Sequence, residues 1–162
     1  MTQIAPSIKS ILKSVSDPEI PVLTILDLGV VRSAEILEDN SVEVVITPTY
    51  SGCPAMDVIG DDIVAAFAEK GMTAHVKLVL SPAWNTDMIT QEGREALEKY
   101  GIAAPLDATS DKKALLGGER IVKCPQCSST NTRLVSQFGS TACKAMFQCE
   151  DCREPFDYFK CL

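Results

Sequence analysis

Four cysteines near the C-terminus form two C-x-x-C pairs, Cys124 with Cys127 and Cys149 with Cys152. Each pair lets two thiolates converge on one metal ion, and two facing pairs complete the tetrahedral sulfur site that is typical of structural zinc. The 21 residues between the pairs slightly exceed the usual spacing, and a hairpin there would absorb the extra length. A set of unrelated buried thiols is improbable with this doubled spacing. We therefore predict that these four residues bind zinc.

Two further cysteines, Cys143 and Cys161, lie in the same C-terminal stretch. Taken singly, each of them is explained by a place in the hydrophobic core as a small residue. The alternative is an additional metal ligand or a redox-active thiol. With six thiols close together, an iron–sulfur cluster, which also takes four cysteines, stays open as an alternative to zinc. The odd total of seven cysteines, without a secretion signal, argues against a disulfide framework.

The remaining cysteine, Cys53, lies between Gly52 and Pro54 at a predicted helix start. Backbone N–H groups and the helix dipole favour a thiolate there, which suits a nucleophile or a metal ligand. A small residue at a tight turn explains the position equally well. From their immediate neighbours in the sequence, Asp17 and Glu19 are explained by a helix end and a turn. If that loop folds back, their carboxylates oppose thiolate formation at Cys53 but assist iron binding.

The elements that must position these groups follow from hydrophobic periodicity and from turn residues. A first amphipathic helix ends at Asp17-Pro18, because the residue before proline avoids the helical region. Thr90 is the predicted cap and Gly101 the predicted stop of the last helix. The expected helices cover 4–15, 54–71 and 90–100, and the expected strands cover 30–37, 42–47 and 76–80.

These elements predict an α+β fold, a small mixed sheet packed by helices, followed by a C-terminal zinc-ribbon domain. We assign residues 1–103 to the first domain, 104–119 to a linker and 120–162 to the ribbon. The linker contains Pro105 and Gly117-Gly118 and shows no clear period. The ribbon is too short for a useful hydrophobic core, so it needs a metal to hold it together.

Composition narrows the class of protein further. The net charge is −7, with 9 basic and 17 acidic residues in 1–118 and 6 basic and 5 acidic residues in 119–162. Such an acidic chain is a poor ligand for nucleic acid. No apolar run reaches the length of a membrane helix, and the N-terminus does not resemble a signal peptide. We therefore expect no nucleic-acid or membrane partner and a cytoplasmic location. A lone histidine, His75, also disfavours a hydrolytic triad.

Several short motifs resemble known families. The stretches 17–21 (DPEIP), 27–29 (DLG) and 49–54 (TYSGCP) resemble the SufT-like iron–sulfur assembly domain. The stretches 81–84 (SPAW), 138–145 (FGSTACKA) and 154–161 (EPFDYFKC) are similar to the PaaD family, which is encoded with the phenylacetyl-CoA ring epoxidase. Together they cover nearly the whole chain.

The resemblance implies a non-catalytic accessory subunit in aerobic phenylacetate degradation. Such a subunit assists iron–sulfur or di-iron centre assembly in its partners, the oxygenase and reductase subunits of the epoxidase, and the resemblance places the working thiol at Cys53. A purely structural subunit of the oxygenase complex and an iron–sulfur electron-transfer component stay open as alternatives, as does a homodimer.

Overall fold

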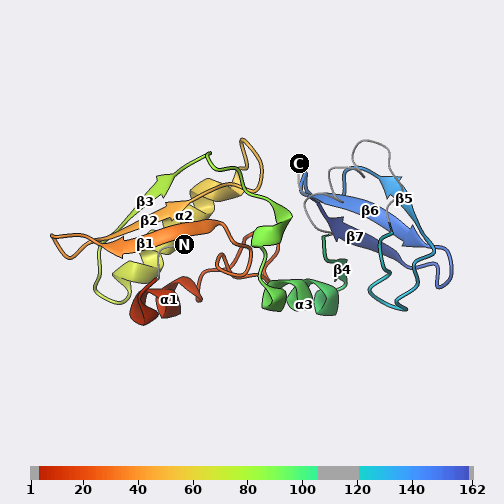
Figure 1. Ribbon diagram of the computed structural model, residues 1–162, viewed down its shortest axis with the longest axis horizontal. Coiled ribbons are helices and arrows are strands. Elements are labelled where there is room, and N and C mark those ends of the chain that lie inside the picture. Colours follow the sequence, from red (N-terminus) through yellow and green to blue (C-terminus); the bar gives the residue numbers. More distant parts are fainter. Residues whose placement is uncertain (1–3, 106–120, 161–162) are drawn as a thin grey trace. The chain divides into compact units, whose positions relative to one another are not determined.

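The computed structural model describes residues 4–105 and 121–160, which belong to two compact units, Met1–Trp84 and Asn85–Leu162 (Figure 1). Each unit contains its own sheet and its own helices. The fold is α+β, as predicted.

The N-terminal unit is built on a three-stranded mixed sheet of order β1-β2-β3. Its β1 and β2 form an antiparallel hairpin, whereas β3 runs parallel to β2 after the crossover helix α2. Alternate residues of β2 are buried, and α1, α2 and the segment between α1 and β1 contribute further large core side chains. The elements are α1 (Pro6–Leu12), β1 (Val31–Ile36), β2 (Val42–Ile46), α2 (Ala55–Ala68) and β3 (Ala74–Leu78).

The C-terminal unit is built on a four-stranded sheet of order β4-β7-β6-β5. The pairs β5–β6 and β6–β7 are antiparallel, and the short β4 pairs with β7 in parallel. Its core is small and centres on Phe147, Phe156 and Tyr158. The elements are η1 (Thr86–Met88), α3 (Gln91–Tyr100), β4 (Ile102–Ala103), β5 (Thr132–Ser136), β6 (Lys144–Cys149) and β7 (Pro155–Phe159).

The local signals for the two ends of α3 are confirmed. The Thr90 hydroxyl accepts a hydrogen bond from the Gly93 N–H at 3.0 Å, and Gly101 ends α3 with φ +93°. Pro54 directly precedes α2, which is the longest described helix at 14 residues. None of the helices in the described stretches is long and apolar enough to cross a bilayer.

Two features differ from the expectations. The C-terminal unit begins at Asn85, so α3 and Ile102–Ala103, which we expected in a first domain ending at residue 103, belong with the ribbon. The cause is the pairing of β4 with β7, a contact between residues 55 positions apart (Ile102 with Asp157). In addition, α1 ends at Leu12, whereas the expected first helix extended to residue 15 and ended at Asp17-Pro18. Most of the expected linker lies outside the described residues.

Candidate functional site

The structure brings the four predicted ligand cysteines together. The Sγ atoms of Cys124 and Cys152 lie 3.7 Å apart, and those of Cys127 and Cys149 lie 3.6 Å apart. All four sulfur atoms lie within 4.8 Å of one another. A tetrahedral ion with bonds of about 2.3 Å places its sulfur ligands roughly 3.8 Å apart. The side chains therefore have the geometry of a single-ion site.

Two turns hold the thiols in place. In the first, the Ser128 N–H donates to the Cys124 carbonyl and the Cys124 N–H donates to the Ser129 carbonyl, both at 2.9 Å. In the second, the Cys149 N–H donates to the Glu154 carbonyl at 3.0 Å. Cys149 ends β6, so the sheet itself fixes the second pair. The hairpin of β5 and β6 takes up part of the long spacing between the pairs, as predicted.

A polar clamp that the sequence motifs did not reveal joins the two turns. The Asp151 carboxylate accepts hydrogen bonds from the Ser129 hydroxyl and from the Asn131 side-chain amide, the latter at 2.9 Å. These hydrogen bonds lower the pKa of Asp151, so the carboxylate stays ionised. The sequence did contain a signal for these hydrogen bonds, namely an acidic residue inside the second C-x-x-C pair and short polar side chains just after the first pair.

The thiols of the cluster cannot all ionise on their own. The N–H groups of Cys152 and Asp151 lower the pKa of Cys149 to about 7. The Glu154 N–H lowers the pKa of Cys152, but burial and the neighbouring thiols outweigh it and raise that pKa to about 12. A divalent cation removes this conflict, because it stabilises every thiolate that binds it. The donor set therefore fits a structural metal, which when bound cross-links the two turns.

Cys53 lies in the turn that precedes α2 and is 9% exposed. Its N–H donates to the Tyr50 carbonyl at 3.3 Å, and Gly52 has the positive φ of +78° that this turn requires. Burial raises the pKa of the Cys53 thiol. The Ala55 N–H and the Tyr50 side chain act in the opposite direction without reversing the shift. At Cys53 burial therefore has a larger effect on the pKa than the backbone N–H groups of the helix start.

Asp17 and Glu19 are the two carboxylates whose charges act on Cys53, and both raise its pKa. The loop after α1 does fold back, held by Asp17, whose carboxylate accepts the N–H groups of Glu19 at 2.9 Å and Ile20 at 2.7 Å. Asp17 is buried, at 6% exposure. Within residues 4–105 and 121–160, however, only the four ribbon cysteines form a group close enough to hold an ion. The carboxylates and Cys53 are therefore electrostatic neighbours rather than a preformed ion cage.

The other predicted site residues lie apart from these groups. Cys143 is buried just before β6, with its Sγ 3.1 Å from the Thr141 hydroxyl, and is not in the four-cysteine group. Cys161 lies outside the described residues. His75, the lone histidine, is exposed on β3.

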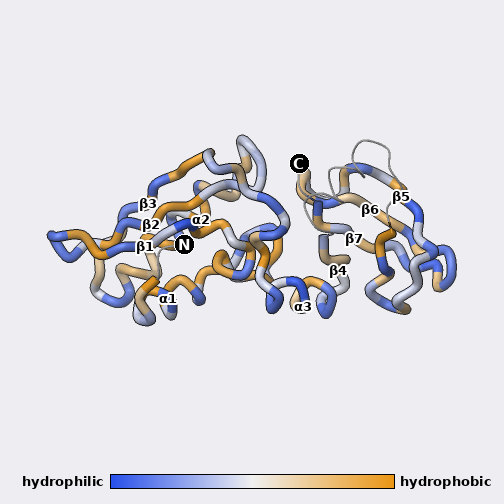
Figure 2. The backbone as a smooth tube through the Cα atoms, in the orientation of Figure 1, coloured by the Kyte–Doolittle hydropathy of each residue, from blue (hydrophilic) through white to orange (hydrophobic). Residues whose placement is uncertain are grey.

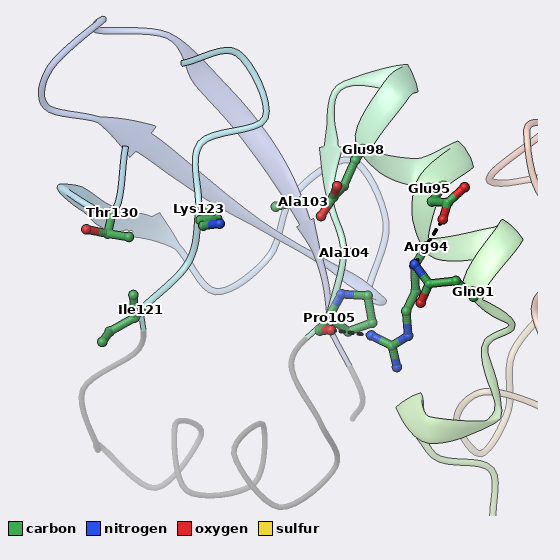
Figure 3. A pocket seen from close by; sticks show the side chains of 10 residues that line it. All are labelled: Gln91, Arg94, Glu95, Glu98, Ala103, Ala104, Pro105, Ile121, Lys123 and Thr130. Atoms are coloured by element: carbon green, nitrogen blue, oxygen red, sulfur yellow. Dashed lines mark hydrogen bonds between the residues drawn. The ribbon is translucent and has the colours of Figure 1, made fainter. Parts of the chain in front are cut away.

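A shallow cavity of about 380 Å³ lies in the C-terminal unit, between α3, the end of β4 and the segment that leads to β5 (Figure 3). Its Arg94 guanidinium donates to the carbonyls of Pro105 and Thr86, both at 2.6 Å. Its Gln91 amide donates to Glu95 at 3.0 Å. No thiol or imidazole is among the described residues that line this cavity. Through these two hydrogen bonds Arg94 joins α3 to the segments that precede and follow it.

Two protein families match the chain in the same order as its domains. An iron–sulfur cluster assembly protein family matches residues 7–77, and a PaaD zinc beta ribbon domain family matches residues 108–160. Fold and site together thus define a protein that joins an iron–sulfur-assembly-type domain to a four-cysteine metal ribbon.

A relative from Escherichia coli (strain K12), called a putative 1,2-phenylacetyl-CoA epoxidase subunit, is 48% identical over 167 residues, covering 100% of this chain and 98% of that protein. The chain therefore belongs to the PaaD family. The N-terminal part has wider relatives. An Fe-S protein maturation auxiliary factor from Porphyromonas gingivalis is 36% identical over 92 residues, which are 56% of this chain and 87% of that protein. A crystal structure of a domain of unknown function from Bacillus anthracis superimposes with a TM-score of 0.52 at 26% identity, covering 56% of this chain and 88% of that one.

Proposed function

We propose that this chain is a non-catalytic accessory factor that assists iron–sulfur or di-iron centre assembly in the oxygenase and reductase subunits of phenylacetyl-CoA epoxidase. The observation that carries the proposal is the setting of Cys53, a buried thiol at the start of α2 on which the charges of Asp17 and Glu19 act. The names of the relatives support the same role, since one is called an epoxidase subunit and another an iron–sulfur maturation factor.

The chemistry of Cys53 suits a carrier of metal better than a covalent catalyst. Its raised pKa keeps the thiol protonated at neutral pH, so it is a poor nucleophile until a cation displaces the proton. The side chains that act most strongly on its pKa are Tyr50, Glu19 and Asp17, and none of these three is a histidine or lysine. The carboxylates of Asp17 and Glu19 disfavour the thiolate but attract an iron cation, for which both oxygen and sulfur donors are suitable. Iron bound at Cys53 is cargo in this scheme.

The ribbon has a separate, structural role in the proposal. Its sulfur atoms lie within 4.8 Å of one another, which suits one ion at the centre. A cluster of several irons needs more room between its cysteine ligands, so the geometry favours zinc over an iron–sulfur electron carrier. The zinc-held ribbon then provides a rigid surface through which the chain stays with its partner subunits.

The test compares cells that carry Cys53→Ala with cells that carry Cys143→Ala, a buried cysteine outside both proposed sites. The epoxidase is isolated from each strain, and its iron content and activity are measured. We expect Cys53→Ala to lower both, while the chain itself folds and accumulates normally, and Cys143→Ala to leave both unchanged. Normal iron and activity with Cys53→Ala would remove this residue from the mechanism and favour a purely structural subunit. An iron–sulfur absorption spectrum that depends on Cys124 would instead identify an electron carrier.

A further inference from the structure

A groove on the N-terminal unit lies between α2 and the outer side of β3. It has a volume of about 600 Å³ and is lined mainly by apolar side chains, together with two aspartates and His75. Val64 and Leu78 in its walls are 43% and 52% exposed, which is high for large apolar residues on so small a unit. Figure 2 shows the apolar stretch that continues from the end of β3. Its lining comprises Ile46, Met56, Asp57, Gly60, Asp61, Val64, Ala74, His75, Val76 and Leu78.

The backbone of β3 beside this groove has an open edge. In the described part of the chain β3 is the last strand of its sheet. The Val42 N–H donates to the Thr73 carbonyl at 2.8 Å, and the Val79 N–H donates to the Ile46 carbonyl at 2.9 Å. Backbone groups of a strand alternate in direction, so those of Val76 point away from β2 and toward the open edge. An extended segment can pair there as a fourth strand.

Gly60 lines the groove, and because it has no side chain it leaves space open there. It lies inside α2, where glycine is a poor helix former. A Cβ atom at this position would lie 3.8 Å from the nearest atom, the Val76 Cγ1, and the backbone has no positive φ there. The fold thus has room for a side chain at position 60, and a longer one would extend into the space beside Val76. The absence of a side chain at Gly60 is not explained by the packing of the unit itself.

The charges around the groove identify its occupant. The rim carries Asp57 and Asp61, which lie one helical turn apart. Residues 1–84 contain 5 basic and 11 acidic side chains. Two copies of this unit meeting edge to edge would bring like charges together, which disfavours a symmetric dimer through β3. The acidic rim instead complements a basic segment.

From these observations we propose that the groove binds an extended basic segment of a partner protein, which adds as a fourth strand to β3. Residues at i and i+4 of a helix are about 6 Å apart, and residues at i and i+2 of a strand are roughly 6.6 Å apart. Two Lys or Arg residues at alternate positions of the bound strand therefore match Asp57 and Asp61, and an apolar residue two positions further meets Val64. This inference stands on the groove alone and does not depend on the role of Cys53.

The probe is a seven-residue peptide, acetyl-Thr-Arg-Thr-Arg-Thr-Val-Thr-amide, with a control in which both arginines are glutamates. Binding to the full chain is measured by calorimetry at low and high salt, and the amide signals of Ala74, Val76 and Leu78 are followed by NMR. We expect the arginine peptide to bind, to shift those three signals and to weaken as salt rises, while the glutamate peptide does not bind.

Three variants make the test specific. Asp61→Lys should weaken the arginine peptide roughly tenfold. Asp62→Lys, which makes the same charge change on a neighbouring exposed residue that does not line the groove, should have little effect. Gly60→Leu should block binding while a melting curve shows the unit folded.

Equal effects of Asp61→Lys and Asp62→Lys would overturn the proposal, because they would reveal non-specific attraction. Absence of arginine-peptide binding would overturn it as well. A concentration-dependent dimer that Gly60→Leu abolishes would identify a second copy of this chain as the occupant and would also refute the basic partner.

Discussion

Loss of one ribbon thiol is expected to unfold the C-terminal sheet and to leave the N-terminal unit intact. One cluster of buried residues in the described part of the ribbon has three aromatic rings as its large side chains, and Phe159 at the end of β7 is buried as well. The Phe147 ring lies 6.0 Å from Phe156 and 5.5 Å from Tyr158, so one aromatic group carries most of this core. A core of this size contributes about 3–5 kcal/mol at most. Binding of structural zinc contributes about 10–16 kcal/mol in comparable peptides at neutral pH, so the metal decides whether the ribbon folds.

The perturbation is Cys149→Ser, and the matched control is Cys143→Ser, a buried thiol outside the four-cysteine group. Metal content is measured by elemental analysis, and folding is followed by NMR at Phe147 in the ribbon and Phe67 in the N-terminal unit. We expect Cys149→Ser to lose the ion and the dispersed Phe147 signal while Phe67 is unchanged. A variant that retains one equivalent of zinc and a folded ribbon would refute this ligand set, as would loss of the ion from Cys143→Ser.

Three further predictions concern single positions. Burial, and to a smaller extent the charge of Glu19, raises the pKa of Cys53, so the alkylation rate of this thiol should rise at higher pH than that of an unstructured cysteine peptide. Glu19→Gln should move the rise to lower pH, and a midpoint of the wild-type pH–rate curve at or below that of the peptide would contradict this. Trp84→Phe removes the indole N–H that donates to the buried Leu28 carbonyl at 2.9 Å, and it should lower the free energy of unfolding in urea by about 1–3 kcal/mol; an unchanged midpoint would exclude that hydrogen bond as a contributor. Gly101→Ala places a side chain at φ +93° and should destabilise the C-terminal unit by about 1 kcal/mol in a thermal melt, whereas equal stability would mean that the turn relaxes without strain.

Features encoded by adjacent residues could be predicted from the sequence. Thr90 and Gly101 mark the two ends of α3 because a cap and a stop act within one helical turn. The four ligand cysteines were predictable for the same reason, since each C-x-x-C pair forms its own turn. Only the approach of the two pairs to one another depends on the rest of the fold.

Features that depend on distant contacts were not predictable in this way. The strand Ile102–Ala103 has two residues and no pattern of its own, so its pairing with β7, and hence the start of the C-terminal unit, is visible only in the structure. The alternation of Val76, Leu78 and Leu80 predicted a strand correctly, but it could not show that Leu78 lies at an open edge. At Cys53 the helix start was visible, whereas the stronger effect of burial was not.

The central claim is that this chain helps to load metal into the epoxidase through Cys53, and an in vitro transfer assay tests it most directly. Metal-depleted oxygenase component is incubated anaerobically with ferrous iron, with or without the purified chain, and the iron bound to the oxygenase is measured over time. We predict that the wild-type chain and Cys143→Ala both accelerate iron incorporation, whereas Cys53→Ala does not. Equal rates with and without the wild-type chain, or full acceleration by Cys53→Ala, would contradict the claim.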